Sequence, residues 1–128
     1  MKKRVLLVED DVASRELLFD WLMREGLEVQ AVNNLASAKA ALVLVTPEAV
    51  LLDIGLGDQN GLDLAAWMRQ RVPLMNVPVI AVTAHAMIAD REFILKAGCN
   101  DYVPKPVDFD RLRTCLAHWF KPVGKARV

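Results

Sequence analysis

The sequence predicts an α/β fold, a doubly wound sheet of five parallel strands covered by five helices. Two observations indicate this class. Five short apolar runs recur along the 128 residues, and stretches with the apolar spacing of helices separate them. Three of the runs have almost no polar break, which is typical of strands that crossover helices bury on both faces. The length is that of one domain, and the sequence contains no recognisable linker or repeat.

Each strand is predicted by a short apolar run. The five strands are expected, in chain order, at residues 5–8, 29–32, 49–52, 79–82 and 102–103. The first, third and fourth runs are the nearly unbroken ones, so these strands should be buried on both faces of the sheet.

Between the strands, apolar residues recur at helical spacing, and a residue that can end a helix follows most stretches. The helices are expected, in chain order, at residues 12–25, 35–45, 62–70, 87–97 and 109–119. Gly26 and Gly98 can close the first and fourth helices. Pro47 ends the second helix and Pro73 follows the third. Asp108 is the expected N-cap of the fifth helix.

Composition and charge exclude several classes of protein. Hydrophobic residues make up 54% of the chain and charged residues 25%, which excludes a disordered or low-complexity chain. Sixteen basic and sixteen acidic residues give a net charge of zero, so no overall field draws the protein to nucleic acid or to an anionic membrane. We therefore expect no direct nucleic-acid binding.

Cysteine content and the N-terminal segment predict a cytoplasmic protein. Cys99 and Cys115 are too few for a disulfide framework and lack metal-ligand spacing, so both should be reduced core thiols. The apolar run at residues 5–8 is too short for a signal peptide, and we expect no membrane insertion.

Residues able to support chemistry follow the predicted strands. The first strand is followed by Glu9-Asp10-Asp11, the third by Asp53 and the fourth by Thr83, while the fifth leads to Lys105. In a doubly wound sheet these positions border one crevice. Crowded carboxylates repel one another, and oxygen ligands without nearby His or Cys favour a hard cation such as Mg²⁺.

Taken singly, most of these residues have an ordinary structural explanation. Asp11 can be the N-cap of the first helix, Thr83 a β-branched strand residue, and Lys105 a solvated side chain. Asp53 is the exception, because a carboxylate that closes a buried run needs a cation or a function. Their joint occurrence at strand ends favours a shared site.

Two enzyme classes share parts of this pattern. The glycines from Gly55 to Gly61 match neither a dinucleotide fingerprint nor a P-loop, and the acids after the first strand would repel a pyrophosphate, which excludes a Rossmann dehydrogenase. A phosphatase with an aspartyl nucleophile would suit Asp53 and Mg²⁺. It would normally need a cap over its substrate, and the sheet and helices leave no residues for one.

Four segments occur in a recognisable order. They are Val8-Glu9-Asp10-Asp11, Leu52-Asp53-Ile54 with Gly61 eight positions after the aspartate, Val82-Thr83-Ala84 and Tyr102-Val103-Pro104-Lys105-Pro106. Together they resemble the motif set of bacterial response-regulator receiver domains over residues 4–120. The resemblance implies the flavodoxin-like strand order 2-1-3-4-5.

The resemblance also implies a phosphorylation site at Asp53. This residue would accept a phosphoryl group from a sensor histidine kinase or a histidine phosphotransfer protein. Asp10, Asp53 and the backbone carbonyl of Gly55 would ligate Mg²⁺, with Glu9 acting largely through water. Lys105 would pair with Asp53 before transfer and with the phosphoryl oxygens afterwards. The protein would catalyse only its own phosphorylation and dephosphorylation, so no separate enzymatic activity is expected.

A conformational switch is implied as well. Thr83 would move to a phosphoryl oxygen and Tyr102 would turn inward with it, altering a protein-binding surface on the fourth helix, fifth strand and fifth helix.

The resemblance has further implications for the loops. The Lys105-Pro106 bond would be cis. Gly57 stands where the family usually has proline, which predicts a looser loop. His85 occupies a position that tunes hydrolysis of the acyl phosphate, or is an ordinary exposed loop residue.

The first predicted helix offers a candidate docking patch for the phosphoryl donor. At about 100° per residue, one side of the helix can face the sheet. The residues on that side are Leu17, Leu18, Trp21 and Leu22. Phe19 and Met23 lie on the opposite side, where they are either scattered surface hydrophobes or the surface that receives a partner helix.

These expectations combine into a receiver domain at residues 1–120 with a short tail at residues 121–128. Its most direct role is a stand-alone response regulator that signals to a downstream protein target through protein contacts. Two alternatives remain: an excised receiver domain of a hybrid histidine kinase or larger regulator, and a pseudo-receiver that acts without phosphorylation.

Overall fold

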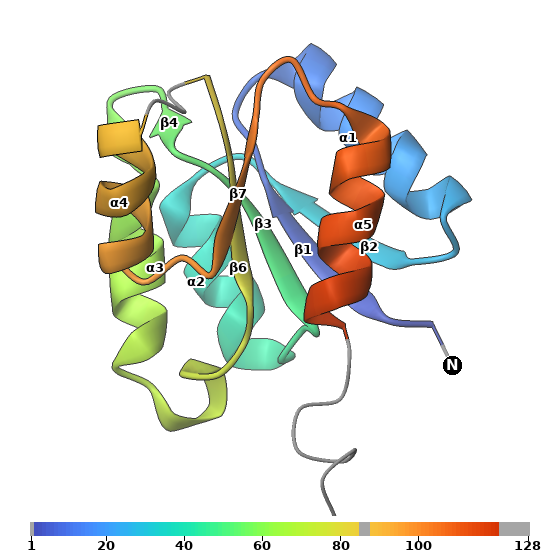
Figure 1. Ribbon diagram of the computed structural model, residues 1–128. Helices are drawn as coiled ribbons and strands as arrows, with labels where there is room; N and C mark the ends of the chain where they lie inside the picture. The colour runs from blue at the N-terminus through green and yellow to red at the C-terminus, as the bar shows by residue number, and fades with distance from the viewer. Residues whose placement is uncertain (1, 85–87, 121–128) are drawn as a thin grey trace, which may run out of the picture.

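The computed structural model describes residues 2–84 and 88–120, which form alternating strands and helices (Figure 1). The strands are β1 (Arg4–Val8), β2 (Glu28–Val32), β3 (Ala49–Asp53), β4 (Gly55–Leu56), β5 (Gln59–Asn60), β6 (Val79–Thr83) and β7 (Asp101–Pro104). The helices are α1 (Val12–Arg24), α2 (Leu35–Leu44), α3 (Leu62–Arg69), the 3₁₀ helix η1 (Val72–Leu74), α4 (Ile88–Lys96) and α5 (Phe109–Trp119). All five predicted strands and all five predicted helices are present.

The main sheet is parallel throughout and has the order β2-β1-β3-β6-β7. Because β6 and β7 are its fourth and fifth strands along the chain, this is the expected order 2-1-3-4-5. The doubly wound fold class is therefore confirmed. Asp108 accepts hydrogen bonds from the backbone N–H groups of Asp110 and Arg111, as expected of the N-cap of α5.

Two hydrophobic clusters lie on opposite faces of the sheet. One contains β3 residues Val50 and Leu52 and is covered by α2, α3 and α4, whereas the other contains Leu51 and is covered by α1 and α5 (Figure 1). Successive residues of β3 thus alternate between the two clusters, and every residue of this strand is buried. Both cysteines are free and buried, as expected.

Strands β4 and β5 form a small antiparallel hairpin that the sequence analysis did not predict. Gly57 lies in its turn with φ of 63°, a left-handed conformation that glycine adopts without strain. The hairpin is tied to α2, because the side-chain oxygen of Gln59 accepts a hydrogen bond from the Leu35 N–H at 3.2 Å. The loop after Asp53 thus contains a short hairpin with Gly57 in its turn, and the greater looseness of this loop stays a prediction.

The rotation of α1 differs from the prediction. Leu18 and Leu22 are buried as expected, but Leu17 is 59% exposed, and Phe19 is partly buried against the core cluster under α1 and α5. Trp21 lies on the side of Leu18 and Leu22 opposite to Phe19, and the centre of its ring is 5.1 Å from the centre of the Phe109 ring.

The direction midway between Leu18 and Leu22 marks the centre of the buried side of α1. Around the helix axis, at 100° per residue, it lies about 50° from the centre of the predicted buried side. With this rotation α1 packs against β2 as well as β1, and Phe19 lies partly buried against the core cluster under α1 and α5. The expectation that Phe19 and Met23 form one exposed patch was therefore wrong for Phe19, while Met23 is 44% exposed.

No helix in residues 2–84 and 88–120 has both the length and the apolar character needed to cross a bilayer. His85, Met87 and the predicted tail at residues 121–128 lie outside the described residues.

Candidate functional site

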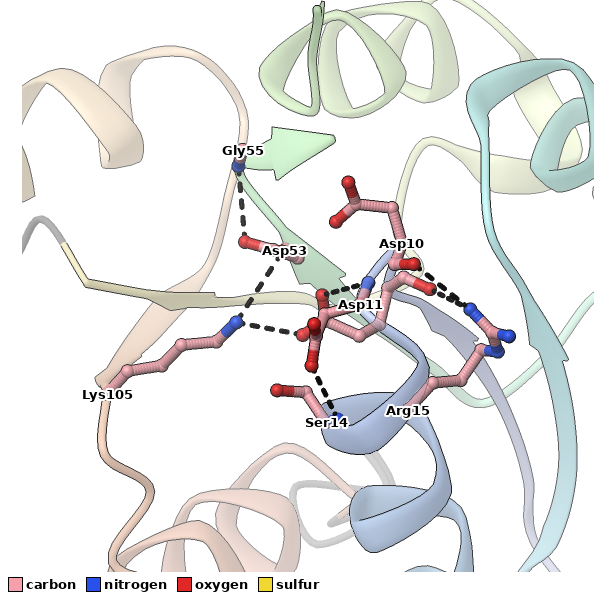
Figure 2. A network of polar contacts seen from close by, with 8 residues as sticks. Asp10, Asp11, Ser14, Arg15, Asp53, Gly55 and Lys105 are labelled. Atoms are coloured by element: carbon pink, nitrogen blue, oxygen red, sulfur yellow. Dashed lines mark hydrogen bonds and ion pairs between the residues drawn. The ribbon is translucent and has the colours of Figure 1, made fainter. Parts of the chain in front are cut away.

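The predicted site residues of the first, third and fifth strands meet at the carboxyl edge of the sheet (Figure 2). Glu9, Asp10 and Asp53 each offer a carboxylate oxygen, and the three oxygens lie within 4.8 Å of one another. Glu9 is only 1% exposed and Asp53 8%, whereas Asp10 is more accessible. The topology brings these acids together because parallel strands end at the same edge.

Lys105 lies between two of these acids. Its ammonium nitrogen is 2.9 Å from Glu9 Oε1 and 3.5 Å from Asp53 Oδ2. Burial tends to lower the pKa of Lys105, but the hydrogen bond to Glu9 and the charges of Asp53 and Glu9 outweigh it and hold that pKa above its ordinary value. The lysine is therefore a fixed positive charge shared by both acids.

The position of Glu9 disfavours the charged form of its carboxyl group. Burial, followed by its hydrogen bond with Asp53, raises the pKa of Glu9, although Lys105 acts in the opposite direction. Glu9 Oε2 also accepts the Asp11 N–H at 3.3 Å.

The carboxylate set fits a hard cation. It consists of three carboxylates with one lysine, so a net negative charge remains in a partly buried site, and a cation would neutralise it. All three ligands are oxygens, which suits Mg²⁺. Asp10 supplies the accessible side through which an ion could enter.

Asp53 is positioned by the loop that follows it. Gly55 donates its N–H to Asp53 Oδ1 at 3.1 Å (Figure 2), and Gly61 donates its N–H to the Ile54 carbonyl at 2.7 Å. A Cβ on Gly61 would lie 2.3 Å from the Asp53 carbonyl oxygen, so only glycine fits against the backbone of the predicted acceptor.

The first turn of α1 contains one residue that the sequence analysis missed. Arg15 donates to the carbonyls of Glu9 and Asp10, at 3.0 and 3.3 Å, and so braces the backbone that carries two of the acids (Figure 2). Spacing alone gives no signal for such a contact.

Asp11 is the N-cap of α1, since its Oδ2 accepts the Ser14 N–H at 2.8 Å, and this confirms its structural explanation.

The predicted switch residues occupy the β6 and β7 strands. Thr83 is buried at the end of β6, and its carbonyl accepts the Lys105 N–H at 2.8 Å. The Lys105-Pro106 bond that follows is cis, as expected. Tyr102 lies on β7 with its hydroxyl accepting a hydrogen bond from Arg91 of α4.

Comparison with known proteins identifies the family. The family model described as "Response regulator receiver domain" matches residues 5–117. The polar-differentiation response regulator DivK of Brucella anthropi is 35% identical over 111 residues, which cover 87% of this chain and 90% of that protein. The transcriptional regulatory protein GltR of Pseudomonas aeruginosa is 38% identical over 104 residues, 81% of this chain but only 43% of GltR.

A solved structure gives the same result. The receiver domain of the sensor histidine kinase PA1611 from Pseudomonas aeruginosa, described with a magnesium ion coordinated in its active site cleft, superimposes with a TM-score of 0.87 at 30% identity. The match covers 95% of this chain and all of that one. With a cluster of acids at the carboxyl edge of a 2-1-3-4-5 sheet, this chain belongs to the response regulator receiver domain family of two-component signalling.

Proposed function

We propose that this protein is a phosphorylation-controlled switch in which Asp53 accepts a phosphoryl group from a sensor histidine kinase or a histidine phosphotransfer protein. The observation that carries the proposal is the Asp53 carboxylate, placed at the carboxyl edge of the sheet beside Lys105 and two further acids. A structural carboxylate would not need this arrangement, since placing two buried acids beside a third acid opposes folding.

In the proposed reaction, a carboxylate oxygen of Asp53 attacks the phosphorus atom of a phosphohistidine. The P–N bond breaks, and its electron pair stays on the histidine nitrogen of the donor. Asp10, Asp53 and the carbonyl of Gly55 would hold Mg²⁺, with Glu9 acting through water. When bound, the metal supplies positive charge against the phosphoryl oxygens. Lys105 supplies a second positive charge from the other side of Asp53.

The proposed switch uses Thr83 and Tyr102. The Thr83 hydroxyl would bond to a phosphoryl oxygen on Asp53, and Tyr102 would turn inward toward the space that Thr83 leaves. The output is contact with a downstream protein rather than a second chemical reaction.

The 90% coverage of DivK supports a stand-alone regulator, whereas the partial coverage of GltR and the likeness to a kinase receiver domain support a longer protein. The size of the protein expressed from its own gene distinguishes the two.

The direct test is labelling with acetyl phosphate. We expect one phosphoryl group per chain with Mg²⁺ present, and none after chelation of the metal. Reduction with borohydride converts an acyl phosphate into homoserine, so mass spectrometry of the peptide that carries Asp53 locates the group. Labelling elsewhere, or equal labelling without a divalent cation, would contradict the proposal.

The donor docking site needs revision, because Phe19 packs against the core. An apolar hollow instead lies between α1 and the segment after β7, lined by Leu17, Pro106 and Val107 together with Lys105. Since Lys105 also contacts Asp53, this hollow adjoins the proposed acceptor. We propose that a helix of the phosphoryl donor docks here, with exposed Leu17 as its main contact.

Leu17→Glu is expected to slow phosphoryl transfer from the cognate donor by about tenfold, because a charge would replace an apolar contact at the centre of the docking site. Labelling by acetyl phosphate should be unchanged. Leu44→Glu is the matched control, because Leu44 is an exposed leucine on the opposite face of the sheet. Equal slowing by both variants would remove the docking assignment.

A further inference from the structure

Tyr102 is held between two arginines on the face formed by α4, β7 and α5. The Arg91 guanidinium carbon lies 5.2 Å from the centre of the tyrosine ring, and that of Arg111 lies 5.3 Å from it. Arg91 also donates a hydrogen bond to the Tyr102 hydroxyl. This bond, with a smaller contribution from the neighbouring Arg111, lowers the pKa of Tyr102, although burial acts in the opposite direction.

Neither of these arginines has a carboxylate partner within 4.0 Å among the residues that the structure describes. Arg113, two positions after Arg111 on the same helix, is different: it bridges Glu25 and Asp110. Two guanidinium groups brought to one ring without an acid between them are a favourable site for a carboxylate from outside, since arginine binds carboxylates through paired, charge-assisted hydrogen bonds.

The surface beside Arg111 has room for such a group. An open hollow there is lined by Tyr102, Arg111, Thr114 and His118, together with Asp101 and Cys115. The Asp101 carboxylate is already engaged, because it accepts hydrogen bonds from Trp119 Nε1 at 2.9 Å and from Cys115 Sγ at 3.3 Å.

We propose that Arg91 and Arg111 form a clamp for a carboxylate of an acidic peptide segment in the downstream partner, and that the Tyr102 hydroxyl masks Arg91 until the switch turns. This inference rests on the proposed function. An inward turn of Tyr102 withdraws the hydroxyl from Arg91, so phosphorylation and binding of the acidic segment favour the same conformation.

The surroundings favour a peptide over a nucleic acid. Asp90 and Glu92 flank Arg91 in the sequence, and Asp110 precedes Arg111, so the two helices that carry the clamp also carry carboxylates that repel an extended polyanion. The net charge of zero gives no wider attraction to a polyanion. A short segment with one or two carboxylates avoids this repulsion.

The test is fluorescence anisotropy with a labelled peptide of glutamate and alanine, alongside the same peptide with glutamine for glutamate. We expect the protein treated with beryllofluoride, a phosphoryl mimic, to bind the glutamate peptide about tenfold more tightly than untreated protein does. Arg91→Gln and Arg111→Gln should each weaken binding to treated protein about tenfold, and Arg113→Gln less than twofold. Equal binding of the glutamine peptide, equal loss with Arg113→Gln, equal binding of a single-stranded oligonucleotide, or no binding would each overturn the clamp.

Tyr102→Phe separates the clamp from the phosphorylation chemistry. It removes the masking hydroxyl but keeps the ring, so the untreated variant should bind the peptide several-fold more tightly than the untreated parent. Tyr102 is the one tyrosine in the sequence, so tyrosinate absorbance reports its pKa directly, and Arg91→Gln should raise that pKa. Absence of both changes would overturn the masking. Beryllofluoride could have no effect on peptide binding while Tyr102→Phe still tightens binding and Arg91→Gln still raises the pKa of Tyr102. In that case the proposed function would fail and the clamp would stand.

Discussion

Asp53→Asn is expected to abolish labelling by acetyl phosphate and, at the same time, to stabilise the fold. An amide has no carboxylate oxygen to form the acyl phosphate, so the loss should be complete. Removing one negative charge beside buried Glu9 relieves repulsion, and Lys105 keeps its partner at 2.9 Å. We expect the free energy of unfolding to rise by about 1–2 kcal/mol.

Urea denaturation, with labelling measured on the same preparation, gives both quantities. Asp58→Asn is the matched control, since Asp58 is an exposed acid in the same loop. It should keep full labelling and change the free energy of unfolding by less than about 0.5 kcal/mol. Labelling of the Asp53→Asn protein at the parent's level would show that the acceptor lies elsewhere.

Gly61→Ala is expected to have a large effect of a different kind. The added methyl group would lie 2.3 Å from the Asp53 carbonyl oxygen and 3.0 Å from Ile54 Cα, so the backbone must move. Such crowding costs about 3 kcal/mol of folding free energy. A shift of about 1 Å at the acceptor would also slow labelling by about 100-fold.

Gly55→Ala is the control for stability, because a Cβ at Gly55 would meet no atom within 4 Å. Its free energy of unfolding should change by less than about 1 kcal/mol. Chemical denaturation of both variants measures the difference. Similar stability losses at the two positions would mean that the close approach at Gly61 does not limit this loop.

Most of the fold could be predicted because its signals are local. The unbroken apolar run that ends at Asp53 identifies a buried strand, and glycine or proline after a helical stretch marks where a helix stops. The proximity of Glu9, Asp53 and Lys105 then follows from topology, because the ends of parallel strands share one edge. Assignment of roles to these residues needed the family resemblance, since residue type alone left several explanations open.

What could not be predicted depends on contacts between distant elements. The rotation of α1 packs Phe19 partly against the core and places the helix over the edge strand β2 as well as β1, and helical spacing contains no information about that neighbour. Arg15 and Arg91 resemble any surface arginine in the sequence, yet one braces the acid-bearing loop and the other bonds to Tyr102. Long side chains reach many positions, and only packing selects one.

The two caps of α2 bear on the order in which the chain folds. Asn34 caps the Ser37 N–H locally, whereas the Leu35 N–H is capped by Gln59, 24 residues later in the hairpin. A helix of ten residues is marginal by itself, and the second cap requires closure of that long loop. The first turn of α2 should therefore be completed only after β3 has paired and the hairpin has formed. Substitutions at Gln59 should speed unfolding more than they slow folding.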